Sequence, residues 1–280
     1  MYCPNCGVKC DDNFKFCIKC GTDLNIKNHI NVIQIMEEGR RFFISENFYE
    51  AIKCFNKVLE EHPSNIGVLL YKADCLLRLG HMEDAVECYE KILKFEPTHF
   101  LSWIQKGFAI YNLEKYHDSL NAFDNALMID NKVDSAFIGQ GMCLQKLNRL
   151  SKAKIAYDNA LRINPQNQMA CLQKAIIFKE EDNVEEAILA YDKLLKMNPY
   201  LLLAWEDKAS LLMKLSDFNG AIECLNEVLK EEPNNIDVLY DMAFCLEKLG
   251  DRKARIIYRK ILRIDPSSKK ALNRINNFFP

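Results

Sequence analysis

The sequence contains no long apolar run and no excess of charge of either sign. Its longest apolar stretches, such as Tyr200 to Trp205, are much shorter than the roughly 18 residues that a membrane-spanning helix requires, so we expect no membrane contact. Lys and Arg number 37 against 39 Asp and Glu, a formal net charge of -2, which predicts no general attraction to nucleic acid. Neither an apolar leader nor a cleavage site follows Met1, so we expect a cytoplasmic protein.

The sequence also lacks the arrangements on which catalysis usually depends. It has no glycine-rich phosphate-binding loop, and no serine or cysteine stands in a recognisable nucleophile setting. Acidic pairs such as Glu60 and Glu61 fall near expected helix ends, where they indicate solvated surface. The apolar fraction of 49% and the charged fraction of 27% are those of an ordinary folded chain. We therefore expect a folded protein that is not an enzyme.

Prolines reveal an internal repeat. Those at five positions lie on a grid of 34 residues, namely Pro63, Pro97, Pro165, Pro199 and Pro233. Asn131 fills the one vacant grid point, and Pro266 arrives one residue early. Self-similarity at this fixed period predicts a solenoid of helix-turn-helix units, in which each proline ends the second helix of its unit.

The residues within each repeat resemble the tetratricopeptide repeat (TPR) family. Counted from Val32, the eighth position is always small: Gly39, Ala73, Gly107, Gly141, Ala175, Ala209 and Ala243. The twenty-fourth position is always large: Phe55, Tyr89, Phe123, Tyr157, Tyr191, Leu225 and Tyr258. A small residue on the first helix lets the second helix approach closely, and the large residue fills the remaining gap.

The resemblance implies an all-α fold, a right-handed TPR α-α superhelix of seven repeats over residues 32–268. Leu272, Ile275 and Phe279 then recur at helical spacing among polar residues. A solenoid needs such a helix to cover its last exposed core, so we expect a C-terminal capping helix over residues 269–280.

Five of the twelve cysteines fall within the first twenty residues. Four of them form two Cys-x-x-Cys-Gly knuckles, with Cys3 and Cys6 in the first and Cys17 and Cys20 in the second. Clustered thiols in a reducing compartment hold a metal more often than they form disulfides, and four thiolates complete a tetrahedral structural zinc site. Four cysteines do not by themselves choose zinc over iron, so a rubredoxin-like iron centre stays an alternative. Cys10 is interpreted as a bystander.

This head resembles the short N-terminal zinc ribbons of archaeal and bacterial cytosolic proteins. The resemblance implies a small zinc-ribbon domain over residues 1–24, with a β-hairpin and four cysteine ligands that hold one structural Zn2+, followed by a linker over residues 25–31. A segment of this length buries too little apolar area to fold alone, so metal binding and folding are expected to be one event.

The other seven cysteines recur at fixed places in the repeats. Three occupy position 10 and three occupy position 23, and only Cys171 falls elsewhere, at position 4. Residues that return at one structural position are interpreted as small apolar core residues rather than as a metal or redox system.

Positions 2, 5, 9 and 12 of each first helix line the concave surface in the TPR family, and here they are unusually apolar. The predicted partner-binding groove consists of Leu70, Leu101, Ile104, Phe108, Tyr111, Ile138, Met142, Met169, Leu172 and Ile176. A contiguous exposed apolar patch normally marks an interaction surface. Two alternatives stay open, because these side chains could be internal core or could be covered by a second copy of the chain in a homo-oligomer.

The sequence thus favours a non-catalytic scaffold that binds an apolar or amphipathic segment of a protein or peptide partner in its groove, with the zinc ribbon as a second docking element. One alternative is a nucleic-acid-associated adaptor of transcription or translation that acts through the ribbon. The charge of the head, -1 with four thiolates and one Zn2+ counted, argues against direct binding to phosphates. Another alternative is a metal-dependent redox protein.

Overall fold

The computed structural model describes Lys19 and residues 26–278. All regular elements of this part are α-helices, which confirms the predicted all-α class. The predicted zinc ribbon, with its β-hairpin, lies outside the described residues. Among the helices described, none is both long and apolar enough to cross a membrane.

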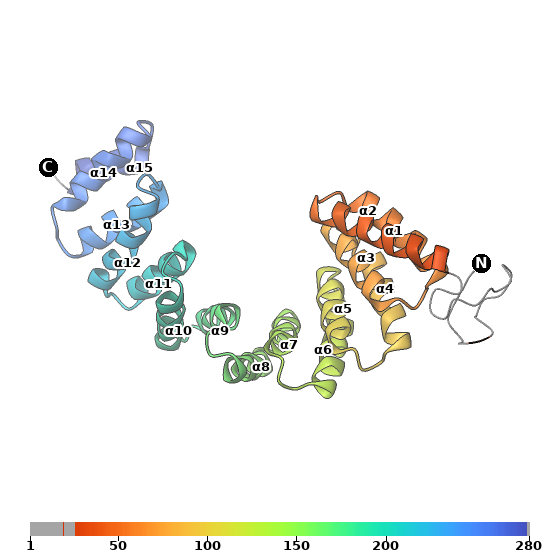
Figure 1. The fold of residues 1–280 in the computed structure, drawn as a ribbon. Helices are drawn as coiled ribbons and strands as arrows, with labels where there is room; N and C mark the ends of the chain where they lie inside the picture. The colour runs from red at the N-terminus through yellow and green to blue at the C-terminus, as the bar shows by residue number, and fades with distance from the viewer. Residues whose placement is uncertain (1–18, 20–25, 279–280) are drawn as a thin grey trace. The chain divides into compact units, whose positions relative to one another are not determined.

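The chain forms two compact units that divide between Asn131 and Lys132. The helices of unit 1 pack as consecutive antiparallel pairs (Figure 1). They are α1 (Ile26–Ile44), α2 (Phe48–Glu61), α3 (Ile66–Arg78), α4 (Met82–Phe95), α5 (Phe100–Asn112) and α6 (Tyr116–Ile129). Residues 26–31, which the sequence assigned to a linker, are helical and form the start of α1.

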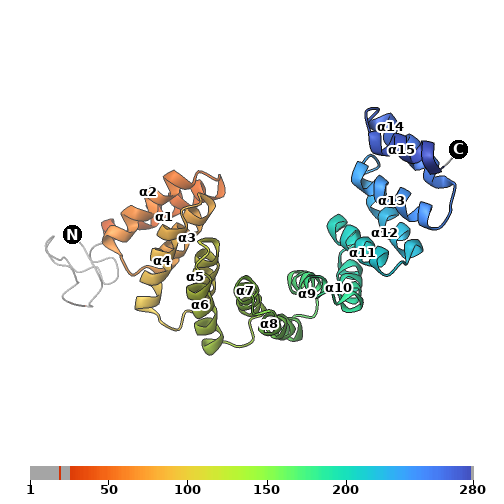
Figure 2. The same cartoon turned by 180° about the vertical axis from the view of Figure 1, so that it is seen from behind.

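Unit 2 continues the same pairing and ends on a single helix, α15, which packs against α14 (Figure 2). Its helices are α7 (Asp134–Lys146), α8 (Leu150–Ile163), α9 (Gln168–Glu180), α10 (Val184–Met197), α11 (Leu202–Lys214), α12 (Phe218–Glu231), α13 (Ile236–Lys248), α14 (Lys253–Ile264) and α15 (Lys269–Phe278).

The small and large positions of each repeat meet in the core of its helix pair. A Cβ atom added to Gly107 on α5 would lie 2.8 Å from the ring of Phe123 on α6, which is fully buried. The same pair is tied by Ser119, whose hydroxyl donates to the Gly107 carbonyl oxygen at 2.7 Å. Close approach of backbone to ring therefore sets the spacing of the two helices, as the sequence predicts.

Every first helix ends in the same turn. The fifteenth residue of each repeat has a positive φ, and five of these seven residues are not glycine: Glu46, Glu114, Asn148, Asp182 and Ser216. In the second repeat the left-handed residue is Gly80, and the next backbone amide, of His81, donates to the Leu76 carbonyl oxygen at 2.9 Å. This is the Schellman arrangement, which satisfies the last carbonyl groups of a helix and reverses the chain.

Helix α15 covers the open end of the last helix pair. Ala271 of α15 is fully buried, and Ile275 packs against the core that α13 and α14 share. Arg274 Nη1 lies 3.5 Å from a carboxylate oxygen of Glu247 on α13, whose side chain is only 8% exposed. An apolar inner side and a charged contact to α13 thus hold the helix in place.

Candidate functional site

We use the term first-helix face for the side of α1, α3, α5, α7, α9, α11 and α13 that carries repeat positions 2, 5, 9 and 12. These spacings place the four side chains on one side of an α-helix. The ten predicted groove residues belong to this face and lie on the four helices α3, α5, α7 and α9. Because the chain divides after Asn131, the face of each unit is described by itself.

In unit 1 the predicted residues differ widely in exposure. Leu101 on α5 is 50% exposed, whereas Ile104, one turn later, is only 3% exposed and belongs to the core. Leu70 on α3 is half-buried. Phe108 and Tyr111 are also half-buried, and the Phe108 ring packs edge-on against Phe123 with 4.9 Å between centroids. Of the five, Leu101 has the most area open to a partner.

Unit 2 shows the same division. Met169 on α9 is 47% exposed, whereas Ile138 on α7 is 7% exposed and buried. Met142, Leu172 and Ile176 are half-buried, and Leu172 packs against the core cluster around Cys171. Ile104 and Ile138 are therefore core residues. At these two positions the alternative of internal packing holds, and the side chains are not part of an open groove.

The first-helix face of unit 2 contains a pocket that sequence reasoning missed. It has a volume of about 450 Å³ and lies among α11, α13, α14 and α15. Its lining consists of Ser210, Met213, Lys214, Tyr240, Asp241, Phe244, Tyr258, Lys270 and Arg274. The signal was present, because Tyr240 and Phe244 occupy positions 5 and 9 of the seventh repeat, beyond the repeats to which the predicted groove was assigned.

Two aromatic rings of this pocket have a lysine ammonium over their faces. The Lys270 ammonium, which belongs to the lining, lies 4.2 Å from the centroid of the Tyr240 ring, and the ammonium of Lys248, which is outside the lining, lies 5.3 Å from that of Phe244. Such contacts hold lysine side chains over aromatic faces. Burial raises the pKa of the Asp241 carboxyl, while the nearby Lys270 lowers it and Asp237 raises it. The pocket thus offers apolar surface bordered by charges of both signs.

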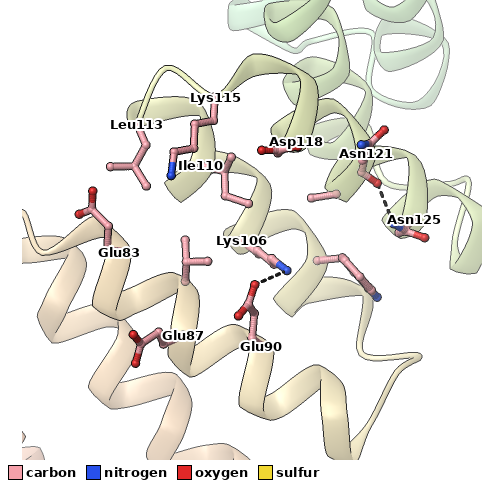
Figure 3. Close-up of a pocket in the computed structure, with 13 residues that line it drawn as sticks. Glu83, Glu87, Glu90, Lys106, Ile110, Leu113, Lys115, Asp118, Asn121 and Asn125 are labelled. Atoms are coloured by element: carbon pink, nitrogen blue, oxygen red, sulfur yellow. Dashed lines mark hydrogen bonds and ion pairs between the residues drawn. The ribbon is translucent and has the colours of Figure 1, made fainter.

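A second pocket, in unit 1, lies among α4, α5 and α6 (Figure 3). Its volume is about 460 Å³, and Glu83, Glu87 and Glu90 of α4 line one side. Lys106 of α5 reaches across to Glu90 at 2.9 Å and also lies 5.4 Å from the Trp103 ring centroid. This ion pair joins α5 to α4 across the pocket. The pocket is therefore interpreted as part of the packing between two neighbouring repeats.

The cysteines of the helical repeats do not form a reactive or metal-binding group. All seven are buried and none forms a disulfide, and burial raises the pKa of the thiols of Cys75, Cys224 and Cys245 to about 11. A thiol kept neutral is a poor nucleophile and a poor metal ligand. Within residues 26–278, no group of three His, Cys, Asp or Glu residues could hold a metal ion. The predicted zinc ligands Cys3, Cys6, Cys17 and Cys20 lie outside the described residues.

Comparison with known families accounts for most of the chain. Tetratricopeptide-repeat models match residues 135–167, 170–200 and 212–273. The model for subunit 3 of the anaphase-promoting complex, or cyclosome, matches residues 44–126. Together these matches cover most of the paired helices of both units, whereas nearly all of α1 and most of α11 lie outside them. The chain belongs to the tetratricopeptide-repeat family. A zinc-ribbon domain model also matches, over residues 2–24, where the sequence places its two cysteine knuckles.

Solved TPR structures share the fold at low sequence identity. The C-terminal part of a TPR repeat-containing protein from Cytophaga hutchinsonii is 15% identical, with a TM-score of 0.71, and the match covers 85% of this chain and 98% of that one. A TPR protein from Parabacteroides merdae is 16% identical, with a TM-score of 0.62 and coverage of 88% and 97%. YrrB, described as a TPR protein with an unusual peptide-binding site, is 20% identical, with a TM-score of 0.54 and coverage of 66% and 96%. No curated protein matches the chain significantly.

Proposed function

We propose that this TPR protein is a non-catalytic scaffold that binds an apolar or amphipathic segment of a partner protein on its first-helix face. The observation that carries the proposal is the exposure of large apolar side chains at position 2 of the first helices. Leu101 is 50% exposed in unit 1, and in unit 2 Met169 is 47% and Leu203 is 77% exposed. Water favours polar residues at such places, and exposed apolar surface that recurs on one face is typical of an interaction site.

The half-buried members of the predicted groove would serve as the floor of this surface. Leu70, Phe108 and Tyr111 in unit 1, like Met142, Leu172 and Ile176 in unit 2, keep part of their area open. Methionines adapt to more than one partner shape. The TPR protein YrrB, whose structure resembles this one, has a peptide-binding site, which supports a peptide segment as the occupant.

The N-terminal ribbon is proposed as a second docking element. Its cysteines Cys3, Cys6, Cys17 and Cys20 would hold one structural Zn2+, and the zinc-ribbon match over residues 2–24 supports this assignment. With all four positions of the metal filled by thiolates, the site has no open position for chemistry. We further propose a cytoplasmic protein with no direct binding to nucleic acid or membrane, because its charge is balanced and no described helix could span a bilayer.

Crosslinking mass spectrometry in native lysate tests the scaffold proposal. Leu101→Glu and Met169→Glu each place a charge on the first-helix face, so crosslinks from that face to partner proteins should be lost. Met128→Glu on α6 and Leu189→Glu on α10 are matched controls, since these side chains are 77% and 67% exposed on second helices. The controls should keep the wild-type crosslinks. Circular dichroism must first show that each variant is folded. If all four variants then lose the crosslinks equally, or if none loses them, the first-helix face is not the partner-binding surface.

A further inference from the structure

The junction between α10 and α11 lacks a helix-capping bond that four other first helices have. Before α3, α5, α9 and α13 the helix begins after a polar residue whose side chain accepts a hydrogen bond from the third backbone amide of the helix: Asn65, His99, Asn167 and Asn235. Before α11 this place is held by Leu201 and before α7 by Val133, and neither residue makes such a bond. A position where local stability has been given up is a candidate for function.

The same junction presents two of the most exposed large apolar side chains of the described residues. Tyr200 is 78% exposed and Leu203 is 77% exposed. At the place of Tyr200, other repeats carry polar residues such as Ser64, Thr98 and Asn234. Neither core packing nor helix capping requires a tyrosine and a leucine here. We therefore interpret these two exposed side chains as contacts for another molecule.

The junction is held firmly while its apolar side chains remain exposed. The Asn198 side-chain amide donates to the Gln168 side-chain oxygen on α9 at 3.2 Å, which ties the loop to the residue that precedes Met169. On the other side, the Trp205 indole N–H donates to the Pro199 carbonyl oxygen at 2.9 Å and folds the loop onto α11. We define Met169, Tyr200 and Leu203 as the junction patch. Because the loop is tied to both helices, little ordering entropy would be lost when a partner binds it.

Carboxylates border the junction patch. Glu206 follows Leu203 by three residues and so lies on the same side of α11. Asp237 occupies on α13 the place that Leu203 occupies on α11. Burial, and then the charges of Glu232, Asp207, Asp241 and Asp237, raise the pKa of the Glu206 carboxyl. This accumulation of like charge favours a cation above the surface.

Neighbouring cations do not neutralise the two carboxylates. Asp207 is paired with Lys179 and also accepts a hydrogen bond from the Tyr191 hydroxyl at 2.7 Å. Within the part of the chain that the structure describes, neither Glu206 nor Asp237 has an ion pair. Their charge is therefore available to a partner.

We propose that the junction patch, together with Glu206 and Asp237, binds a cationic amphipathic segment of a partner protein. Its apolar side chains lie against Met169, Tyr200 and Leu203, and its Lys or Arg side chains lie above the carboxylates. The proposal rests on the scaffold function proposed above and names the chemistry of the partner. A second copy of this chain fits less well, because two copies of the same acidic surface repel each other and three side chains supply little of the roughly 800 Å² per partner that a stable dimer buries.

A pair of synthetic peptides tests the chemistry. One is a fluorescein-labelled peptide of about four helical turns, built of Leu and Lys with Leu at helical spacing, and its matched control has Glu in place of every Lys. Fluorescence anisotropy with the full chain should show binding of the Leu/Lys peptide that weakens with added salt, and at least roughly tenfold weaker binding of the Leu/Glu peptide.

Variants of exposed residues locate the binding. Leu203→Ser should weaken the Leu/Lys peptide by roughly tenfold or more, and Glu206→Gln with Asp237→Asn should weaken it by roughly fivefold or more and flatten its salt dependence. The matched controls on α10, Leu189→Ser and Glu185→Gln with Glu186→Gln, should leave its affinity unchanged.

Three results would overturn the proposal. They are preference for the Leu/Glu peptide, affinity that the junction variants do not alter, and a wild-type dimer in sedimentation equilibrium that Leu203→Ser dissociates. If the Leu/Glu peptide binds and Leu203→Ser abolishes its binding, the assigned charge is wrong while the first-helix face stands as an interaction surface. The scaffold function itself fails only if the crosslinks to partners also prove independent of Leu101 and Met169.

Discussion

At the scale of single residues, one contact sets the geometry of each helix pair. Where position 8 is glycine, the ring at position 24 lies directly against the backbone, and in the fourth repeat a Cβ atom on Gly141 would lie 2.6 Å from the Tyr157 ring. Tyr157 is fully buried, and its hydroxyl donates to the Gln145 side-chain oxygen at 3.2 Å. The ring therefore has little freedom to move aside.

Gly141→Ala should lower the free energy of unfolding by about 1 to 3 kcal/mol, because the added methyl group overpacks this contact. Gly67→Ala is the matched control, since its Cβ would meet its nearest neighbour, the Asn65 side chain, at an ordinary 3.5 Å. The control should leave stability unchanged or raise it by less than about 1 kcal/mol through helix propensity. Urea unfolding followed by circular dichroism measures both. A stabilised Gly141→Ala would mean that α8 can adopt the spacing of the alanine-containing repeats.

The buried thiols predict a second effect at this scale. Burial, followed by the charge of Asp74, raises the pKa of Cys75 from 9.0 to about 11. The unfolded chain therefore loses this proton at a lower pH than the folded chain does. The contribution of the neutral thiol to stability is full below pH 9 and is lost as the pH rises toward 11.

Comparison of the wild type with Cys75→Ala isolates this contribution. The wild type should be the more stable at about pH 8, and the difference should shrink by about 1 to 3 kcal/mol between about pH 8 and about pH 11. Urea midpoints across this range, under reducing conditions, measure it. A difference that stays constant with pH would show that the folded thiol ionises as readily as the unfolded one.

At the scale of elements, a repeated ion pair joins three of the helix pairs to the pair that precedes each of them. Position 7 of a first helix carries a lysine that meets the carboxylate at position 25 of the preceding second helix. Lys106 pairs with Glu90 at 2.9 Å, Lys208 with Asp192 at 2.6 Å, and Lys174 with Asp158. In two cases the lysine also covers the ring of a tryptophan three residues earlier. Packing across the repeat junction thus includes a charged component.

A double-mutant cycle with Lys208→Met and Asp192→Asn should give a coupling free energy of about 0.5 to 1 kcal/mol, because the lysine side chain is only 17% exposed. The pair of Lys214 and Asp182 is the control, with side chains 54% and 79% exposed and a distance of 3.2 Å. Its coupling should be close to zero. Similar couplings for the two pairs would show that burial at the junction does not strengthen the interaction.

At the scale of the whole molecule, the chain combines two helical units with a cysteine-rich head, and metal is expected in the head alone. The cores of the described helices consist mainly of apolar side chains and cysteines, with Ser102 and Ser119 as buried polar residues. Each unit also has its own first-helix face with exposed apolar residues, so a partner could be bound through either unit.

The purified full chain should be colourless and contain about one zinc ion per chain, as a closed site of four thiolates requires. Cys17→Ser should abolish zinc binding, whereas Cys10→Ser, the matched control in the same head, should retain it. Inductively coupled plasma mass spectrometry measures the metal. Chelation should leave the helical circular dichroism almost unchanged, since no metal-binding group occurs within residues 26–278. Iron with visible absorption would contradict the zinc assignment.

The sequence by itself determined the architecture, because the contacts that specify it are local. The small residue at position 8 and the large one at position 24 lie in the same repeat, as Gly107 and Phe123 do, so their spacing alone predicts the helix pair. The turn geometry was less visible, since most residues with a positive φ at position 15 are not glycine. The left-handed conformation there is imposed by the hydrogen bonds that end the helix and by the packing of its pair.

Only the tertiary structure decided which apolar residues of the first-helix face are open. Ile104 and Leu172 both occupy position 5, yet Ile104 is buried and Leu172 is half-buried. Exposure depends on the side chains of adjoining helices, and the repeat pattern specifies where a side chain points and not what covers it. For the same reason the repeat pattern places Tyr240 and Phe244 on the first-helix face but does not predict the pocket around them, because Lys270 and Arg274 of the separate helix α15 complete it.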